Sequence, residues 1–170
     1  MTIENLIKFP SKLIIPGGQV PKGRVKVSGA KNSGTRLLAA ASLTDERVVL
    51  SNFPTKLVDA QHKLRFLANI GFDVQVDYDL EEVQLLGGSI HYDKLPDFGY
   101  PIRTTYLLAA AQLCRSGIAR IPYPGGCKIG SRGYDLHILV WEKLGCTVSE
   151  QPEYIEIKGN LTGGVIDFPK

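Results

Sequence analysis

The sequence LLAAASL at residues 37–43 returns as LLAAAQL at residues 107–113, an offset of 70 residues, and this repeat decides the expected fold. Further along, LANIG at residues 67–71 corresponds to WEKLG at residues 141–145, and the offset has grown to 74. The second copy has therefore gained four residues between these two matches. A repeat of this length predicts that one structural unit occurs twice.

Each copy is predicted to form a β-α-β-α-β-β unit, because Ala- and Leu-rich helical runs alternate with short β-rich runs and glycine stops. In the first copy we expect a strand at 24–27, a helix at about 33–43, a strand at 47–51, a helix at about 58–70, and strands at 72–76 and 82–86. In the second copy we expect a helix at about 103–115, a strand at 118–121, a helix at about 133–144, and strands at 147–149 and 154–157. Residues 161–168 are expected to form the first strand of a third copy. The predicted fold class is α/β.

The composition is that of an ordinary globular domain and excludes several classes of function. Of the 170 residues, 44% are hydrophobic and 22% are charged, so the chain can bury a core. The net charge is only +3 and the charges are scattered, which argues against a nucleic-acid partner. Residues 1–12 lack the apolar run of a signal peptide, and no later stretch predicts a membrane span.

The three cysteines predict a reducing, cytoplasmic environment. Cys114, Cys127 and Cys146 are an odd number without CxxC spacing, so neither a disulfide framework nor a zinc site is expected, and no cofactor is indicated. Cys114 and Cys146 fall in an expected helix and next to an expected strand, where core packing explains them. Cys127 differs, because it lies in the glycine-rich segment PGGCKIGSRG at residues 124–133, where the four residues were inserted.

Two segments have the residue types of an anion-handling site. Cys127 is followed by Lys128 and Arg132, and nearby cations favour the reactive thiolate, whereas a buried or plain surface cysteine is the alternative. Lys31 and Asn32 stand between an expected strand and a helix start, where backbone N–H groups and the helix dipole favour an anion. The alternative makes Asn32 or Ser33 a helix cap and Lys31 a surface charge. Three other arginines are expected to be solvated surface residues: Arg65, Arg115 and Arg120.

These two segments carry a family resemblance. The stretch VSGAKN at residues 27–32 and the stretch PGGCKIGSR at residues 124–132, continuing to Asp135, Leu136 and His137, resemble the signature elements of UDP-N-acetylglucosamine 1-carboxyvinyltransferases. Arg103, at an expected helix start, is similar to a family arginine as well. The resemblance implies a two-domain protein in which each domain is an inside-out α/β barrel, made of three β-α-β-α-β-β units around buried helices.

The resemblance also implies how the chain is divided. Residues 23–170 would form one truncated enolpyruvyl transferase domain, with units at about 23–90 and 91–160 and a third unit begun at about 161. Residues 1–22 would be an N-terminal segment with a strand belonging to the absent second domain. The family takes its general-base aspartate and a further arginine from that second domain. We therefore expect a fragment or one partner of a split enzyme, inactive alone, with a second polypeptide supplying the missing domain.

The implied reaction is enolpyruvyl transfer from phosphoenolpyruvate to a hydroxyl of UDP-N-acetylglucosamine, a step of peptidoglycan precursor synthesis. By resemblance, the catalytic residues would be Cys127, which delivers a proton and attacks phosphoenolpyruvate, and Lys31 and Arg132, which face that substrate. Substrate-binding residues would be Arg103 for the phosphate or carboxylate, Asn32 for the acceptor sugar, and Asp135 and Leu136 for the uridine end. His137 receives no role.

Two departures from the family pattern leave the acceptor open. Arg36 follows Lys31 by five residues, a feature similar to the sister family that acts on shikimate 3-phosphate, so Arg36 is a candidate acceptor ligand. Gly133 and Tyr134 replace the family's usual proline and small aliphatic residue. The alternatives are therefore another uridine nucleotide, a shikimate-type acceptor, or a non-catalytic half-domain that binds a nucleotide sugar.

Overall fold

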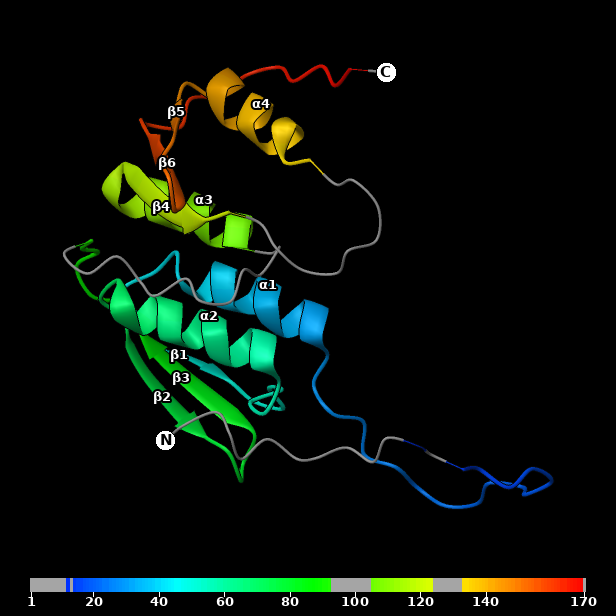
Figure 1. The fold of residues 1–170 in the computed structure, drawn as a ribbon. Coiled ribbons are helices and arrows are strands. Elements are labelled where there is room, and N and C mark those ends of the chain that lie inside the picture. The colour runs from blue at the N-terminus through cyan, green and yellow to red at the C-terminus, as the bar shows by residue number, and fades with distance from the viewer. Residues whose placement is uncertain (1–11, 13, 93–104, 124–132, 170) are drawn as a thin grey trace.

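The computed structural model describes residues 12, 14–92, 105–123 and 133–169, which contain four helices and six strands (Figure 1). The first half contains α1 (Lys31–Ala41), β1 (Val48–Leu50), α2 (Val58–Asn69), β2 (Asp73–Asp77) and β3 (Glu82–Leu86). The second half contains α3 (Tyr106–Ser116), β4 (Ile118–Pro122), α4 (Asp135–Lys143), β5 (Thr147–Glu150) and β6 (Tyr154–Lys158). None of the described helices is long and apolar enough to cross a membrane.

Both halves have the same internal topology. The first half forms an antiparallel sheet of order β1-β3-β2, and the second forms an antiparallel sheet of order β4-β6-β5. In each sheet the last strand of the unit therefore lies in the middle. The predicted helices and these strands lie within a few residues of their expected ranges, except that the expected start of α3 at Arg103 falls outside the described residues.

Two predicted strands are wrong. Residues 24–27 and 161–168 form neither helix nor strand in the structure. A strand needs a neighbour that accepts and donates ladder hydrogen bonds, and neither segment pairs with a described strand. Val25 and Val27 are accordingly 88% and 78% exposed. The described unit is α-β-α-β-β, one strand shorter than the unit predicted from the sequence.

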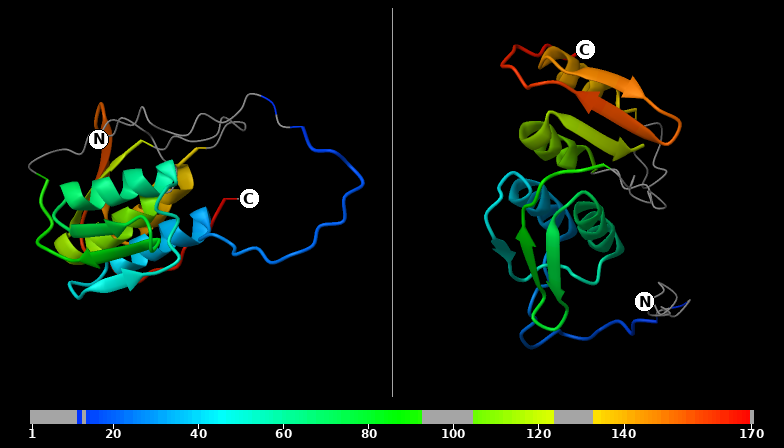
Figure 2. Two further views of the ribbon diagram at one scale, coloured as in Figure 1. Left: turned by 90° about the horizontal axis from the view of Figure 1, so that it is seen from below. Right: turned by 90° about the vertical axis from the view of Figure 1, so that its left-hand side faces the viewer.

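The core is formed by helices packed on the inner faces of the two sheets. The alternation in β3 buries Val83 and Leu85, and in β6 it buries Ile155 and Ile157. The helix α1 contacts both α2 and α3, so the two units meet along their helices (Figures 1 and 2). Leu38 and Leu108, which are equivalent positions of the repeated sequence, are almost completely buried at this helical layer.

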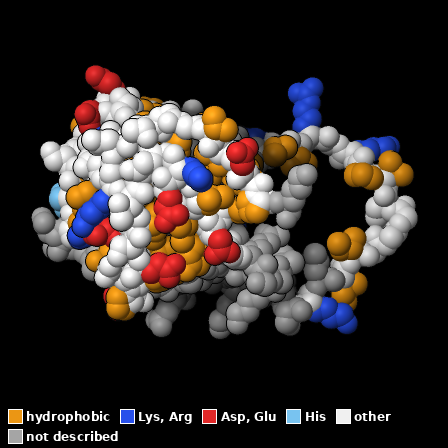
Figure 3. All heavy atoms as spheres, turned by 90° about the horizontal axis from the view of Figure 1, so that it is seen from above, with side chains coloured by type: hydrophobic (Ala, Val, Ile, Leu, Met, Phe, Trp, Pro, Cys, Tyr) orange, Lys and Arg blue, Asp and Glu red, His pale blue; other side chains and the backbone are white. Residues whose placement is uncertain are grey.

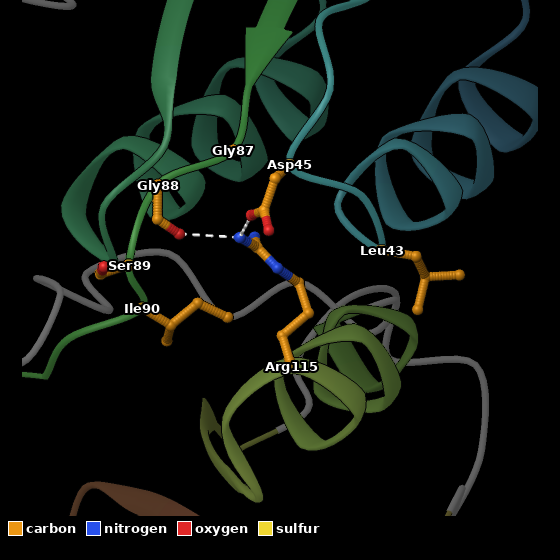
Figure 4. A pocket seen from close by; sticks show the side chains of 7 residues that line it. All are labelled: Leu43, Asp45, Gly87, Gly88, Ser89, Ile90 and Arg115. Carbon is orange, nitrogen blue, oxygen red and sulfur yellow. Dashed lines mark hydrogen bonds and ion pairs between the residues drawn. The ribbon is translucent and has the colours of Figure 1, made fainter.

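Arg115 contacts residues of the first unit, so the prediction that it is a solvated surface residue is wrong. Its Nη2 atom pairs with the Asp45 carboxylate and donates to the Gly88 carbonyl oxygen at 2.7 Å, as Figure 4 shows. Its guanidinium carbon lies 4.8 Å from the centre of the Phe72 ring. The side chain is 11% exposed and lines a cavity of about 460 Å³. Asp45 and Arg115 are equivalent positions of the repeat, 70 residues apart.

The prediction for Arg120 is also wrong, whereas that for Arg65 is confirmed. Arg120 is 27% exposed, donates through Nε to Glu156 at 2.8 Å, and lies over the rings of Tyr92 and Tyr154. Arg65 is exposed on α2. Both mistaken arginines make contacts with residues distant in the sequence, which local periodicity does not reveal.

The two described cysteines differ. Cys146 is 7% exposed in the core, which confirms its predicted packing role. Cys114 is exposed on α3, so the prediction that it packs in the core is wrong. The reason is its place on the helix: Leu113 one residue earlier is buried, and the next position rotates by about 100° towards solvent.

Candidate functional site

The start of α1 presents backbone donors to solvent. Lys31 is the first helical residue, and the N-cap Ala30 has an extended backbone, with φ −81° and ψ 135°. Among the described residues, no side chain caps this end, and the first turn of α1 holds no acidic residue. The N–H groups of a helix's first turn have no partner within the helix, and together with the positive end of the helix dipole they favour an anionic ligand here.

Two glycines seat this helix start on the turn at residues 52–54. A Cβ atom on Gly29 would collide with the Asn52 carbonyl oxygen, and one on Gly34 would lie 3.1 Å from the Phe53 and Pro54 rings. The turn itself is fixed by the Phe53 amide, which donates to the Glu81 carbonyl oxygen at 2.7 Å. Glycine is required at position 29 because the two backbones approach too closely for any side chain.

Lys31 reaches from the start of α1 to the start of α2. Its ammonium pairs with the carboxylate of Asp59, the second residue of α2. The Lys31 side chain is 55% exposed and the Asp59 side chain 21%, so the pair lies at the surface with its carboxylate on the protein side. Lys31 is therefore a surface charge that forms an ion pair between the two helices. The sequence analysis missed Asp59, although an acid in a helix's first turn was a visible signal.

Lys63 is the second residue that the sequence analysis missed. It lies one turn after Asp59 on α2 and is only 1% exposed. The pKa of its ammonium is lowered to about 8, mainly by burial; the Asp59 carboxylate opposes this shift, and the charges of Arg36 and Lys31 add to it. An amphipathic pattern alone does not distinguish a buried lysine from a surface one. Lys63 is therefore influenced by one nearby carboxylate and by two other positive charges.

Asn32 and Arg36 are brought together on α1. The Nη1 atom of Arg36 donates to the Asn32 carbonyl oxygen at 2.9 Å, one turn earlier on the helix. The buried Thr35 donates to the same oxygen at 3.3 Å. Both Asn32 and Arg36 remain exposed. Arg36 is thus folded back toward the helix start, where its charge adds to that of Lys31.

The start of α4 rests on aromatic side chains. Asp135 is its first residue, and Leu136 is 49% exposed. The His137 ring stacks on Tyr106 with 4.3 Å between ring centres, and Tyr106 lies against Trp141 at 5.6 Å. This packing fixes the orientation of the first turn of α4, so Asp135 and Leu136 are presented at a defined place.

Tyr134, at the N-cap of α4, is held from the neighbouring sheet. Its hydroxyl lies 3.2 Å from Glu150 Oε1, and its ring lies near those of Tyr106 and Tyr123. Burial and the nearby Glu150 carboxylate raise the pKa of Tyr134, so the hydroxyl stays protonated at neutral pH and can donate.

The starts of α1, α2 and α4 point toward the same end of the molecule in both Figure 1 and the left view of Figure 2. Lys31, Asn32 and Arg36 are therefore at the same end as Asp135 and Leu136. Three predicted residues lie outside the described residues: Cys127, Arg132 and Arg103. The inserted segment that holds Cys127 and Arg132 follows Tyr123 and rejoins the described chain at Gly133, two residues before α4.

The sequence is similar to known proteins over nearly its whole length. Residues 15–169 match the family model for EPSP synthase (3-phosphoshikimate 1-carboxyvinyltransferase). A UDP-N-acetylglucosamine 1-carboxyvinyltransferase of Maricaulis maris is 36% identical over 162 residues, and one of Beijerinckia indica is 35% identical over 170. These matches cover 93% and 94% of this chain but only 38% and 39% of the relatives, so the chain spans about two fifths of their length.

A solved structure shares the fold. The enolpyruvyl transferase NikO from Streptomyces tendae superposes with a TM-score of 0.66 at 22% sequence identity, over 83% of this chain and 31% of that one. From the family match over nearly all of the sequence, together with this shared fold, we conclude that the chain belongs to the EPSP synthase family of enolpyruvyl transferases.

Proposed function

We propose that this chain is part of an enzyme that transfers the enolpyruvyl group of phosphoenolpyruvate to a hydroxyl of UDP-N-acetylglucosamine, in peptidoglycan precursor synthesis. The observation that carries the proposal is the uncapped start of α1 with Lys31 and Arg36 beside it, in a chain of this family. The names of relatives at 35–36% identity support this acceptor over a shikimate-type one.

The reaction needs its anionic substrate to be held by cations. Phosphoenolpyruvate carries a carboxylate and a phosphate, and its phosphate leaves after the acceptor hydroxyl has added to C2. The start of α1 would hold one of these anions through backbone N–H groups and the Lys31 ammonium. In this proposal Arg132 and Arg103 hold the remaining negative charge, because a guanidinium binds carboxylate or phosphate through two parallel hydrogen bonds.

The reaction also needs a proton at C3 of phosphoenolpyruvate. We assign that proton to Cys127, whose thiol would act as a general acid and whose thiolate could attack the substrate. The neighbouring Lys128 and Arg132 would stabilise the thiolate. Among the other two cysteines, Cys146 is buried in the core and Cys114 is exposed on α3, so neither competes for this role.

The acceptor would be held at the same end of the molecule. Asn32, exposed at the start of α1, is proposed to bind the sugar. Asp135 and the backbone near Leu136 are proposed to bind the uridine end, since both lie at the exposed first turn of α4.

On the face seen in Figure 3, acidic, basic and hydrophobic side chains are intermixed, and this face offers no single-sign patch for a nucleic acid.

The test is phosphate release from phosphoenolpyruvate and UDP-N-acetylglucosamine. Because the chain spans about two fifths of its relatives, we propose that turnover needs the rest of the enzyme. The chain is assayed alone and after addition of the remaining part of the Maricaulis maris relative. We expect release only in the mixture, and loss of at least about 100-fold with Cys127→Ser, the size of a missing general acid. The matched control is Cys114→Ser, which removes an exposed thiol on α3 and leaves release unchanged.

Two other results would count against parts of this proposal. Release by the chain alone would show that no second domain is needed. Binding of UDP-N-acetylglucosamine without release in any mixture would favour a non-catalytic nucleotide-sugar-binding module.

A further inference from the structure

Lys63 is an unusual residue for its place between α1 and α2. It is the largest side chain among those almost completely buried, at 1% exposure, and α1 packs directly on α2. Lysine is almost never fully buried unless it is paired, because removing an ammonium from water is costly. The position therefore requires an explanation beyond filling space, which a leucine or methionine would do better.

The geometry points to Asp59 as the group that Lys63 serves. The two residues are four apart on α2, so their side chains lie on the same face of the helix, one turn from each other. The same carboxylate pairs with Lys31 from α1. Asp59 therefore forms an ion pair with a half-exposed cation and lies within the electrostatic influence of a buried one.

This arrangement matters when an anion reaches the start of α1. To contact the ligand, the Lys31 ammonium must turn from the Asp59 carboxylate toward solvent. Asp59 is only 21% exposed, so a carboxylate left there without a cation would lose much of its stabilisation. A second cation on the protein side reduces this loss of stabilisation, because the Asp59 carboxylate then has a positive charge nearby whichever way Lys31 points.

We propose that Lys63 is a positioning residue of the anion site, which neutralises Asp59 and so allows Lys31 to exchange that carboxylate for the phosphate or carboxylate of the ligand. The inference rests on the proposed function, since it takes Lys31 as a ligand-binding cation. Lys63 itself does not touch the ligand.

The first test measures phosphoenolpyruvate binding to the purified chain by calorimetry at pH 7. We expect Lys63→Met to weaken binding about tenfold, and Lys63→Gln to behave alike. The control is Lys158→Met, because Lys158 and Arg120 also share one carboxylate, that of Glu156, in the other unit. Lys158→Met should bind as the wild type does. Equal binding by wild type and Lys63→Met would overturn the inference while the proposed function stands.

The pH dependence separates a charge effect from a packing effect. Among the described residues, the charged groups that act on Lys63 include Asp59 on its own helix and Lys31 and Arg36 on α1. Because burial lowers the pKa of Lys63 to about 8, its charge is present below that pH and is lost above it. Wild-type affinity should therefore fall as the pH rises through about 8, and this fall should be missing in Lys63→Met. A fall of the same size in both proteins would contradict the proposal.

A third test needs no ligand. Urea unfolding is measured for wild type, Lys31→Met, Lys63→Met and the double variant. We expect Lys31→Met to reduce the folding equilibrium constant about fivefold more when Lys63 is also methionine, because Asp59 then loses both partners. Additive effects would overturn the charge sharing. If wild type fails to bind phosphoenolpyruvate while the cycle is non-additive, the positioning role falls and only the shared carboxylate remains, whereas the proposed function is decided by phosphate release in the mixture.

Discussion

The second helices of the two units, α2 and α4, occupy equivalent places in the repeat but carry different chemistry at their starts. Counting back from the match of residues 67–71 with 141–145, Lys63 of α2 is equivalent to His137 of α4. Lys63 is buried beside Asp59 within a charged cluster, whereas His137 is exposed and stacks on Tyr106. One scaffold thus supports a charged helix start in the first unit and an aromatic one in the second.

This difference suggests that the two helix starts bind different parts of the substrates. The charged start in the first unit suits a small, highly charged anion, and the aromatic-supported start in the second suits the uridine end of a nucleotide sugar. In the proposed enzyme the inserted segment with Cys127 joins the second unit just before α4 and completes the reaction site. The predictions below test this difference between the two helix starts.

Substitutions at the two helix starts should change different kinetic constants, and this is where we expect the greatest change. In the complemented enzyme, Lys31→Met should lower kcat/KM by about 10²–10³, as expected when a cation that stabilises transition-state charge is lost. Asp135→Asn should instead raise the KM for UDP-N-acetylglucosamine about tenfold and leave kcat nearly unchanged. Initial rates over both substrate concentrations measure these effects. If Asp135→Asn lowered kcat as strongly as Lys31→Met does, the two units would not divide the work in this way.

The next effect concerns how the charged start is seated. Gly29→Ala should destabilise the chain by about 2–3 kcal/mol, because the added methyl group collides with the Asn52 carbonyl oxygen. Gly17→Ala is the control, since a Cβ atom there meets nothing within 4 Å. Urea unfolding compares the two. Equal stabilities would mean that residues 27–32 do not sit on the turn at 52–54 as described.

The burial of the Lys63 charge should reduce the free energy of unfolding at neutral pH. Lys63→Met is expected to stabilise the free chain by about 1–2 kcal/mol at pH 7, because it removes the cost of burying a cation while Asp59 keeps Lys31. The pKa of Lys63 is about 8 when folded and 10.5 in the unfolded reference, so wild-type stability should rise between these values as the folded state releases its proton first. The advantage of Lys63→Met should shrink over the same range. Unfolding free energies at pH 7, 9 and 10.5 give the answer, and a constant difference would show that folding does not lower the pKa of Lys63.

The smallest expected effect concerns the joint between the units. Arg115→Met should cost about 1 kcal/mol, because it removes two hydrogen bonds and the contact with Phe72 but leaves the exposed Asp45 hydrated. Arg65→Met, at an exposed position of α2, should change stability by less than about 0.5 kcal/mol. Thermal unfolding of both variants measures the difference, and equal stabilities would show that the joint contributes nothing.

The sequence predicted the elements of each unit well because each helix and most strands have a local signature. The exceptions were the strands at 24–27 and 161–168, since strand formation depends on a pairing partner that a local pattern does not specify. The repeat itself predicted that two similar sheets would form.

The site was predicted only where the motif named a residue. Lys31, Asn32 and Arg36 were proposed from the sequence, whereas Asp59 and Lys63 were not, because they come from a helix whose pattern is ordinary. Arg115 and Arg120 were mistaken for surface residues because their partners, Asp45 and Glu156, lie 70 and 36 residues away in the sequence. Contacts between elements decide which charges are buried, and single-sequence periodicity carries no information on them.

The most direct test of the whole account is a crystal structure of the chain soaked with phosphoenolpyruvate. We predict that one anionic group of the ligand lies against the first turn of α1, with the Lys31 ammonium turned toward it and away from Asp59. Phosphoenolpyruvate bound elsewhere, with Lys31 still paired to Asp59, would contradict the assignment of this helix start as the anion site.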